Sequence, residues 1–161
     1  MTEEKRWRVG VAGVVVHGER VLLVRHTYGQ KRGRWAMPGG YTHHHERLDE
    51  SVVRELREEL GLETEVVDLI GLVTRYTERG GAVYAVFRLR PVSGQPAPDG
   101  LEVDRIGWFS AGEIAAMSDD EIWPDSRNPA IAALKAGDGL FDNERYPGRS
   151  ESNRGFLLGW E

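Results

Sequence analysis

The residues best suited to chemistry are three glutamates, Glu55, Glu58 and Glu59, which lie close together in the chain. In a helix, residues at positions i, i+3 and i+4 fall on one face. Three neighbouring carboxylates repel one another, and their own spacing offers no compensation. A divalent cation would remove the repulsion, and Mg²⁺ is the usual ion where phosphates complete the coordination shell. Taken alone, such a cluster is more often the solvated face of a helix.

The chain around these glutamates has the pattern of an amphipathic helix from about Leu48 to Leu60. Leu48, Val52, Leu56 and Leu60 recur every four residues and form one apolar stripe. Gly61 is placed to end the helix in a left-handed conformation. The predicted helix therefore buries its stripe and turns its carboxylates to a neighbouring face.

The other segments predict a mixture of strands and helices. Apolar, β-branched runs predict strands at Val9–Val16, Arg20–Arg25, Glu65–Tyr76, Ala82–Arg90 and Val103–Phe109. Two loops are predicted at Tyr28–Arg34 and Pro91–Gly100. A capping box at Ser110 predicts a short helix through Ala116, and Asn128-Pro129 predicts another that ends at Gly137. Because strands and helices do not alternate regularly, we expect an α/β fold with a mixed sheet and helices on its faces.

The spacing of polar residues around the first helix resembles a known motif. Gly40 is followed by five residues, Glu46, seven more residues and then the run Arg54–Leu62, RELREELGL. This pattern resembles the Nudix box at every specified position. At about 7% usage per residue type, a chance match is on the order of one in a million or less. A looser resemblance to the Nudix fold extends from about Val9 to about Gly137.

The resemblance implies a Nudix-type α/β/α sandwich with a mixed sheet. It places the Nudix domain at residues 1–137 and leaves residues 138–161 as a C-terminal tail. The tail carries Phe141, Tyr146, Phe156 and Trp160 among polar residues. Three fates are open for it: folding over a pocket, packing on a partner chain, or partial disorder.

The resemblance also implies a metal centre. The implied ligands of Mg²⁺, or alternatively Mn²⁺, are the carboxylates of Glu55, Glu58 and Glu59 and the backbone carbonyl of Gly39. Arg54 in such proteins fixes the carboxylates by an ion pair, with Glu46 as its expected partner, in the manner of residues that orient metal ligands.

The implied reaction is hydrolysis of a diphosphate linkage by attack of water at phosphorus. The metal neutralises charge on the phosphates and helps to form hydroxide, and a carboxylate acts as general base. Three carboxylates stay open for that role: Glu58, Glu59 and Glu102. Glu102 lies six residues before Trp108, where MutT-like relatives carry an acidic residue that reaches the metal site. Its alternative is an exposed loop carboxylate.

Several cations and aromatic residues are candidates for substrate binding. The candidate ligands of substrate phosphates are Arg25, Arg34, Arg75 and Arg127, each of which is otherwise an ordinary surface arginine. Trp35, Tyr76 and Trp123 are candidates to stack on a base, with packing in the core or at its rim as the alternative. His43, His44 and His45 suggest a transition-metal tripod, or else exposed loop histidines. In relatives a glycine usually stands where this chain has His45, so the loop before Glu46 is expected to differ.

Several functions stay open at this level. The first is hydrolysis of a nucleoside triphosphate or another nucleoside diphosphate derivative, and the second is an ADP-ribose or nucleotide-sugar pyrophosphatase. A third is a nucleotide-sensing Nudix domain that does not hydrolyse its ligand, although such domains can dispense with the metal carboxylates. Prenyl diphosphate isomerases resemble this fold, but they use a cysteine, and this chain has none.

The amino-acid composition of the chain limits the classes of molecule that it is expected to bind. The 161 residues suit one domain, and a net charge of −5 disfavours a nucleic-acid polymer as a partner but allows a small phosphorylated molecule. The absence of cysteine excludes disulfides and thiolate chemistry, and it fits the cytoplasm. We see neither a signal peptide nor a transmembrane run and expect no membrane partner. Formation of a homodimer is left open.

Overall fold

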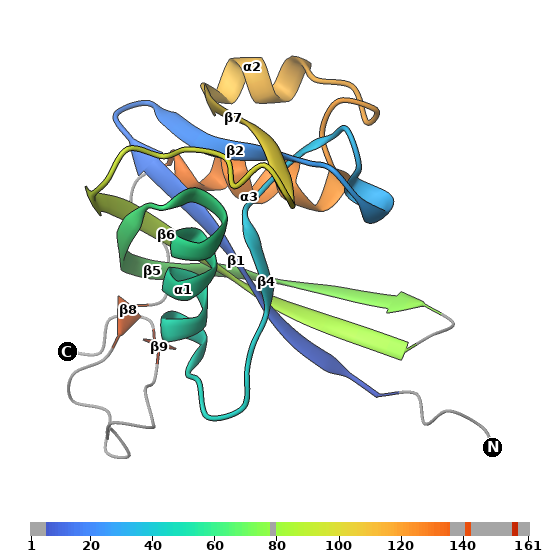
Figure 1. Cartoon of the computed structure of the whole chain (residues 1–161), viewed down its shortest axis with the longest axis vertical. Coiled ribbons are helices and arrows are strands. Elements are labelled where there is room, and N and C mark those ends of the chain that lie inside the picture. The colour runs from blue at the N-terminus through green and yellow to red at the C-terminus, as the bar shows by residue number, and fades with distance from the viewer. Residues whose placement is uncertain (1–5, 78–79, 136–140, 143–155, 158–161) are drawn as a thin grey trace.

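The computed structural model describes residues 6–77, 80–135, 141–142 and 156–157 (Figure 1). Its strands in this part of the chain are β1 (Arg8–His17), β2 (Arg20–His26), β3 (Trp35–Ala36), β4 (Gly39–Tyr41), β5 (Glu63–Thr77), β6 (Gly80–Ser93), β7 (Val103–Phe109), β8 (Phe141–Asp142) and β9 (Phe156–Leu157). Its helices are α1 (Leu48–Leu60), α2 (Ala111–Ala116) and α3 (Pro124–Ala133), with a 3-10 turn η1 at Gly29–Lys31.

The strands β1 to β7 form one mixed sheet in which β1 is central. β1 pairs in parallel with β6 and antiparallel with β4, and β6 pairs antiparallel with the long strand β5. At its end β1 meets β2 only at Val16 and His17, and β2 then continues between β3 and β7. The single parallel pair among antiparallel pairs makes the sheet mixed, as expected.

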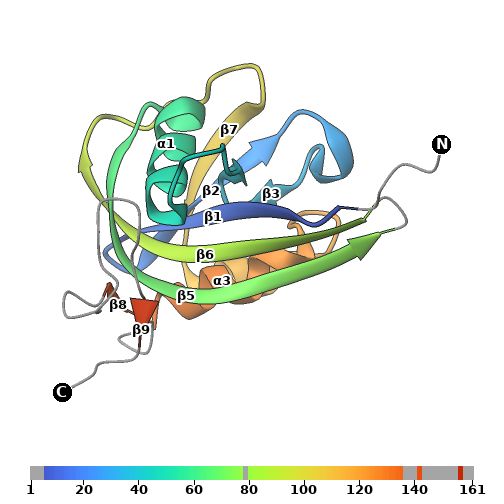
Figure 2. The same ribbon diagram turned by 90° about the horizontal axis from the view of Figure 1, so that it is seen from below.

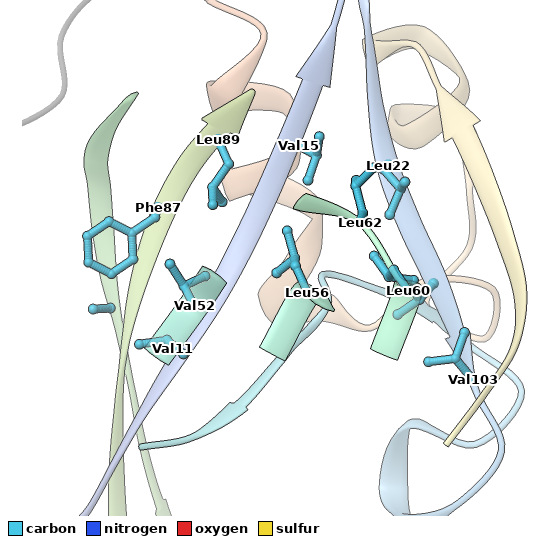
Figure 3. Packing of buried hydrophobic residues seen from close by; sticks show 12 residues of the cluster. Val11, Val15, Leu22, Val52, Leu56, Leu60, Leu62, Phe87, Leu89 and Val103 are labelled. Carbon is cyan, nitrogen blue, oxygen red and sulfur yellow. The ribbon is translucent and has the colours of Figure 1, made fainter. Parts of the chain in front are cut away.

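Helix α1 covers one face of this sheet (Figure 3). Its predicted apolar stripe is buried: Val52, Leu56 and Leu60 are each 0% exposed and belong to a cluster with Val11 and Phe87 from the sheet. Burying a side chain of this size contributes roughly 1.5–3 kcal/mol. The stripe therefore fixes the rotation of α1 about its axis, and this rotation sets where the glutamates point.

Helix α3 covers the opposite face (Figure 2), and α2 contacts α3. A second buried cluster joins Val14 and Leu23 of the sheet to Ile114 of α2 and to Ala130 and Ala133 of α3. Helices on both faces of a mixed sheet give the α/β/α sandwich that the sequence predicted.

Most predicted elements lie where they were expected. α1 and β7 match their predicted bounds, and Gly61 ends α1 in the left-handed region at φ 64°. Ser110 caps α2 by accepting a hydrogen bond from the nitrogen of Glu113, as the capping box predicted. The loop predicted at Pro91–Gly100 was partly wrong, because β6 continues to Ser93 by pairing with the start of β5.

The start of the last helix was also predicted wrongly. α3 begins at Pro124 rather than at Pro129, which lies inside the helix. Pro124 and Asp125 carry the same signals of a helix start, namely a proline at the first helical position and an acidic first turn. The earlier start loses the hydrogen bond that the nitrogen of residue 129 would donate. It buries Ser126, whose hydroxyl accepts a hydrogen bond from the nitrogen of Met37 at 3.1 Å.

Only two pieces of the predicted tail are described. β8 and β9 pair antiparallel, and β8 lies near β5. Tyr146, Trp160 and Gly137 lie outside the described residues, so the fates predicted for the tail stay predictions. In the described part of the chain, no helix is long and apolar enough to span a bilayer.

Candidate metal centre and substrate pocket

Two of the three glutamates of the motif, Glu55 and Glu59, lie on the side of α1 that faces β4. Glu59 is only 4% exposed, whereas the side chain of Glu58 is 57% exposed. The side chain of Glu55 lies between these extremes at 12% exposure. One face of the helix therefore carries one buried, one nearly buried and one solvent-facing carboxylate.

Two glycines let the backbone of β4 approach these carboxylates. The nitrogen of Gly39 donates a hydrogen bond to Oε2 of Glu59 at 3.3 Å. Gly39 has φ 150°, and a Cβ there would collide with the carbonyl oxygen of Val11. A Cβ on Gly40 would lie 2.7 Å from the carboxylate of Glu55. A side chain at either position would therefore displace the strand or the carboxylate.

Arg54 connects the carboxylates to the loop before the helix. Its guanidinium donates to Glu46 at 2.6 Å, to Glu55 at 2.8 Å and to Glu58 at 3.0 Å. It also donates to the carbonyl of Tyr41 at 3.2 Å. The hydrogen bond from Arg54 lowers the pKa of Glu46 to about 2. Glu46 is thus the partner that the sequence assigned to Arg54, and the pair joins α1 to the preceding loop.

The cluster carries more negative charge than its surroundings compensate. Burial, and then the charge of Glu55, raise the pKa of Glu59 to about 8. Burial also raises the pKa of Glu55, despite its hydrogen bond from Arg54. Buried carboxylates beside a close-lying backbone are a donor set that suits a hard divalent cation.

The side chains do not, as they lie, converge on one point. Among the described residues, no three histidine, aspartate or glutamate side chains are grouped so as to hold a metal ion. Glu55 and Glu58 are drawn to Arg54, while Glu59 faces the nitrogen of Gly39. Glu58 is exposed on the helix surface, so its side chain can turn toward the other two without disturbing the core.

The structure brings Glu102 to the same cluster. Glu102 immediately precedes β7, and its carbonyl accepts a hydrogen bond from the nitrogen of Thr27 at 3.0 Å. Its carboxylate accepts a hydrogen bond from the hydroxyl of Tyr28 at 3.0 Å. The charge of Glu102 contributes to the raised pKa values of both Glu55 and Glu59. Glu102 therefore lies beside Tyr28 and near enough to Glu55 and Glu59 for its charge to act on them.

A pocket opens between the sheet, η1 and the start of α3. Its lining residues are Ala12, Lys31, Met37, Val73, Arg75, Tyr84, Val86, Trp123, Asp125 and Ser126. The guanidinium of Arg75 lies over the ring of Trp123, 4.5 Å from its centre. Ala12 pairs with Gly39 across β1 and β4, so the pocket adjoins the strand that approaches Glu59.

The four arginines predicted as phosphate ligands are each paired with an aspartate. The pairs are Arg25 with Asp104, Arg34 with Asp120, Arg75 with Asp125, and Arg127 with Asp119. Of these arginines, Arg75 lines the pocket. Among the aromatic candidates, Trp123 lines the pocket, Trp35 packs edge-on against Phe109, and Tyr76 is 68% exposed.

The histidine triplet lies on the loop before α1. His43, His44 and His45 are exposed, and in the described chain they form no metal-binding group with other histidine or acidic residues. His45 adopts φ 67°, the left-handed conformation that a glycine would take without strain. The nitrogen of His43 donates to Oε2 of Glu46 at 3.0 Å, so the loop still reaches Glu46.

Sequence reasoning missed Lys31 and Tyr28. Both lie in the segment predicted only as a basic loop, and Lys31 ends the 3-10 turn η1. The available signal was the cluster of basic residues in that loop. A single 3-10 turn decides which of them faces inward, and the pattern of residues does not reveal it.

Comparison with known proteins agrees with this fold. The family model described as the NUDIX domain matches residues 6–131, so the chain belongs to the NUDIX family. A MutT-like protein of Streptomyces ambofaciens is 35% identical over 66% of this chain and 66% of its own. An ADP-ribose pyrophosphatase of Methanocaldococcus jannaschii is 33% identical over 54% of this chain and 53% of its own. The chain thus spans roughly half to two thirds of these relatives.

A solved structure shows the same architecture. The MutT NUDIX hydrolase of Burkholderia pseudomallei superimposes with a TM-score of 0.70 at 26% identity, covering 80% of this chain and 97% of that one. Nudix hydrolases act on small nucleotide-like molecules and generally use divalent metal ions.

Proposed function

We propose that this chain is a Mg²⁺-dependent hydrolase that cleaves a diphosphate linkage in a nucleoside triphosphate or another nucleoside diphosphate derivative, with Mn²⁺ as an alternative ion. The observation that carries the proposal is the buried carboxyl group of Glu59, held beside the backbone of Gly39 on the helix that also presents Glu55 and Glu58. A bound cation would stabilise the ionised form of this carboxyl group.

The chain's own groups divide the work as follows. Glu55, Glu58, Glu59 and the carbonyl of Gly39 would hold the ion, which when bound neutralises phosphate charge and acidifies water. Arg54 keeps two of the carboxylates in place through its hydrogen bonds.

The reaction is an attack of water on phosphorus. The oxygen of water forms a bond to one phosphorus while the bond from that phosphorus to the bridging oxygen breaks, and the other phosphate leaves. The proton from water goes to a carboxylate, for which Glu58, Glu59 and Glu102 are the candidates. Glu102 is supported by its position near the cluster and by the hydroxyl of Tyr28, which orients it.

The pocket beside β4 is the place for the group attached to the diphosphate. Trp123 offers an aromatic surface, although Arg75 already covers one part of it. Asp125 and Ser126 add polar atoms at the start of α3. These groups suit a nucleoside, in which a planar base is joined to a polar sugar.

A second candidate is hydrolysis of ADP-ribose or a nucleotide sugar. It is favoured by the relative from Methanocaldococcus jannaschii, which is named an ADP-ribose pyrophosphatase. The relative named MutT-like favours nucleoside triphosphates instead. A nucleotide sensor without turnover is the third reading. Cytoplasmic location, the absence of a nucleic-acid partner, dimer formation and the division at residue 137 stay predictions.

The deciding experiment is a substrate panel with and without Mg²⁺. Nucleoside triphosphates, ADP-ribose and nucleotide sugars are incubated with the protein, and the phosphorus products are identified. We expect Mg²⁺-dependent turnover that falls roughly 100-fold or more in Glu58→Gln and Glu59→Gln. Glu65→Gln, an exposed carboxylate on β5, serves as the control. Binding without turnover would favour the sensor, and wild-type rates in both variants would remove the proposed metal site.

A further inference from the structure

Lys31 lines the pocket and lies near enough to Glu59 for the charge of that carboxylate to act on its ammonium group. It is partly buried and lines the pocket together with Arg75, Trp123 and Asp125. Burial lowers the pKa of Lys31, and the charge of Glu59 acts in the opposite direction. The ammonium group therefore lies within electrostatic reach of a proposed metal ligand on one side and of the pocket on the other.

Lys31 differs from the arginines that the sequence favoured. Each of those arginines has an aspartate partner. Within the described residues, by contrast, the ammonium of Lys31 makes no hydrogen bond and no ion pair, although its pKa responds to the charges of Glu59, Arg75 and Asp125. A cation that has lost part of its hydration without gaining a direct partner is costly to the fold. Such a group is suited to a ligand that brings its own negative charge.

The groups around the pocket provide no anionic partner for the ammonium of Lys31, so a bound anion could take that place. Asp125 is committed to Arg75, which also donates to Gln30 at 3.4 Å. The other nearby group that favours the charged form of Lys31 is Glu59, when it is ionised. If Glu59 holds a cation, as the proposed function requires, its charge no longer serves Lys31. A phosphate oxygen from the substrate would then compensate the lysine, as ammonium groups do for phosphates elsewhere.

We propose that Lys31 binds a non-bridging phosphate oxygen of the substrate's diphosphate, at the passage from the glutamate cluster to the pocket. The metal-bound phosphate would lie on the Glu59 side of the lysine and the substrate's remaining group on the Trp123 side. This inference rests on the proposed function and adds to it a substrate-binding residue.

The test uses methylenediphosphonate, a diphosphate analogue that cannot be hydrolysed. Its binding in Mg²⁺ is measured by calorimetry on the full chain and on Lys31→Met, Lys31→Arg and Arg32→Met. A charge-assisted hydrogen bond corresponds to roughly a 10- to 100-fold loss of affinity in Lys31→Met. Lys31→Arg keeps the charge and should lose less. Arg32→Met, an exposed neighbour, should bind as the wild type does.

The outcomes separate this inference from the proposed function. Unchanged affinity in Lys31→Met, or an equal loss in Arg32→Met, overturns the role of Lys31 even if the wild type hydrolyses a diphosphate substrate. A wild type that binds the analogue through Lys31 but hydrolyses no member of the panel overturns the proposed function alone. If Lys31→Met does not fold, Lys31→Gln takes its place, and the same loss of affinity is expected.

Discussion

The position of Glu59 predicts that its loss will stabilise the metal-free protein. Its pKa of about 8 lies far above the ordinary value of 4.5, and burial is the main cause. Below pH 4.5 the carboxyl is neutral in both the folded and the unfolded chain, so it makes no difference there. As the pH rises from 4.5 to 8, the unfolded chain releases a proton that the folded chain keeps, and the folded state loses stability.

The size of this effect follows from the same pKa. Each pH unit over which only the unfolded chain has lost this proton lowers the free energy of unfolding by about 1.4 kcal/mol. The loss therefore amounts to about 3 kcal/mol at pH 7. Glu59→Gln removes the charge but keeps an oxygen that can accept from the nitrogen of Gly39. We therefore expect this variant to gain about 2–3 kcal/mol at pH 7, which raises Tm by roughly 5–10 °C.

The assay is urea unfolding in EDTA at pH 5, 7 and 8. The difference between Glu59→Gln and the wild type should grow with pH, whereas Glu65→Gln should show no such growth. Added Mg²⁺ should stabilise the wild type and reverse the order, because only the wild type keeps the full set of ligands. A variant that is no more stable than the wild type at pH 7 in EDTA would refute this reasoning.

Three further predictions concern neighbouring residues. Gly39→Ala should lower the free energy of unfolding in urea by about 3 kcal/mol or more, because the added Cβ would meet the carbonyl of Val11 and side chains rarely tolerate the backbone conformation of residue 39. A free energy of unfolding within about 1 kcal/mol of the wild type would contradict this. Tyr28→Phe removes only the hydroxyl on Glu102 and should lower kcat roughly three- to tenfold with little change in KM; in a Glu102→Gln background it should have no effect. His26 is 5% exposed, and burial lowers its pKa to about 4, so stability is lost as the pH falls from 6.5 toward 4. His26→Leu should reduce the difference in unfolding free energy between pH 7 and pH 4 by about 3 kcal/mol, and an unchanged difference would show that His26 does not cause the loss.

The elements with a regular apolar period were predictable from the sequence. The four-residue period of Leu48, Val52, Leu56 and Leu60 gave α1 its bounds, because burial of that stripe dominates the energy of the helix. The same argument fixed the face that carries the glutamates. The short strands β3 and β4 were not predicted, since two or three residues show no period.

The features that the sequence did not predict depend on contacts between segments that are distant in the chain. The start of α3 depended on Ser126 reaching the backbone of Met37, a partner 89 residues away. The four candidate arginines looked alike in the sequence, and their aspartate partners became visible only in the fold. Lys31 became a candidate for the opposite reason, because the fold brought no partner in the described residues to its ammonium group.

In the proposed function, a divalent cation bound by Glu55, Glu58 and Glu59 faces a diphosphate. The most direct measurement is a crystal structure with Mg²⁺ and a nucleotide whose bridging oxygen is replaced by methylene. We expect an ion about 2.1 Å from oxygens of Glu55, Glu58 and Glu59, with phosphate oxygens completing its shell. Bound nucleotide with those glutamates turned to bulk solvent and no ion between them would contradict it.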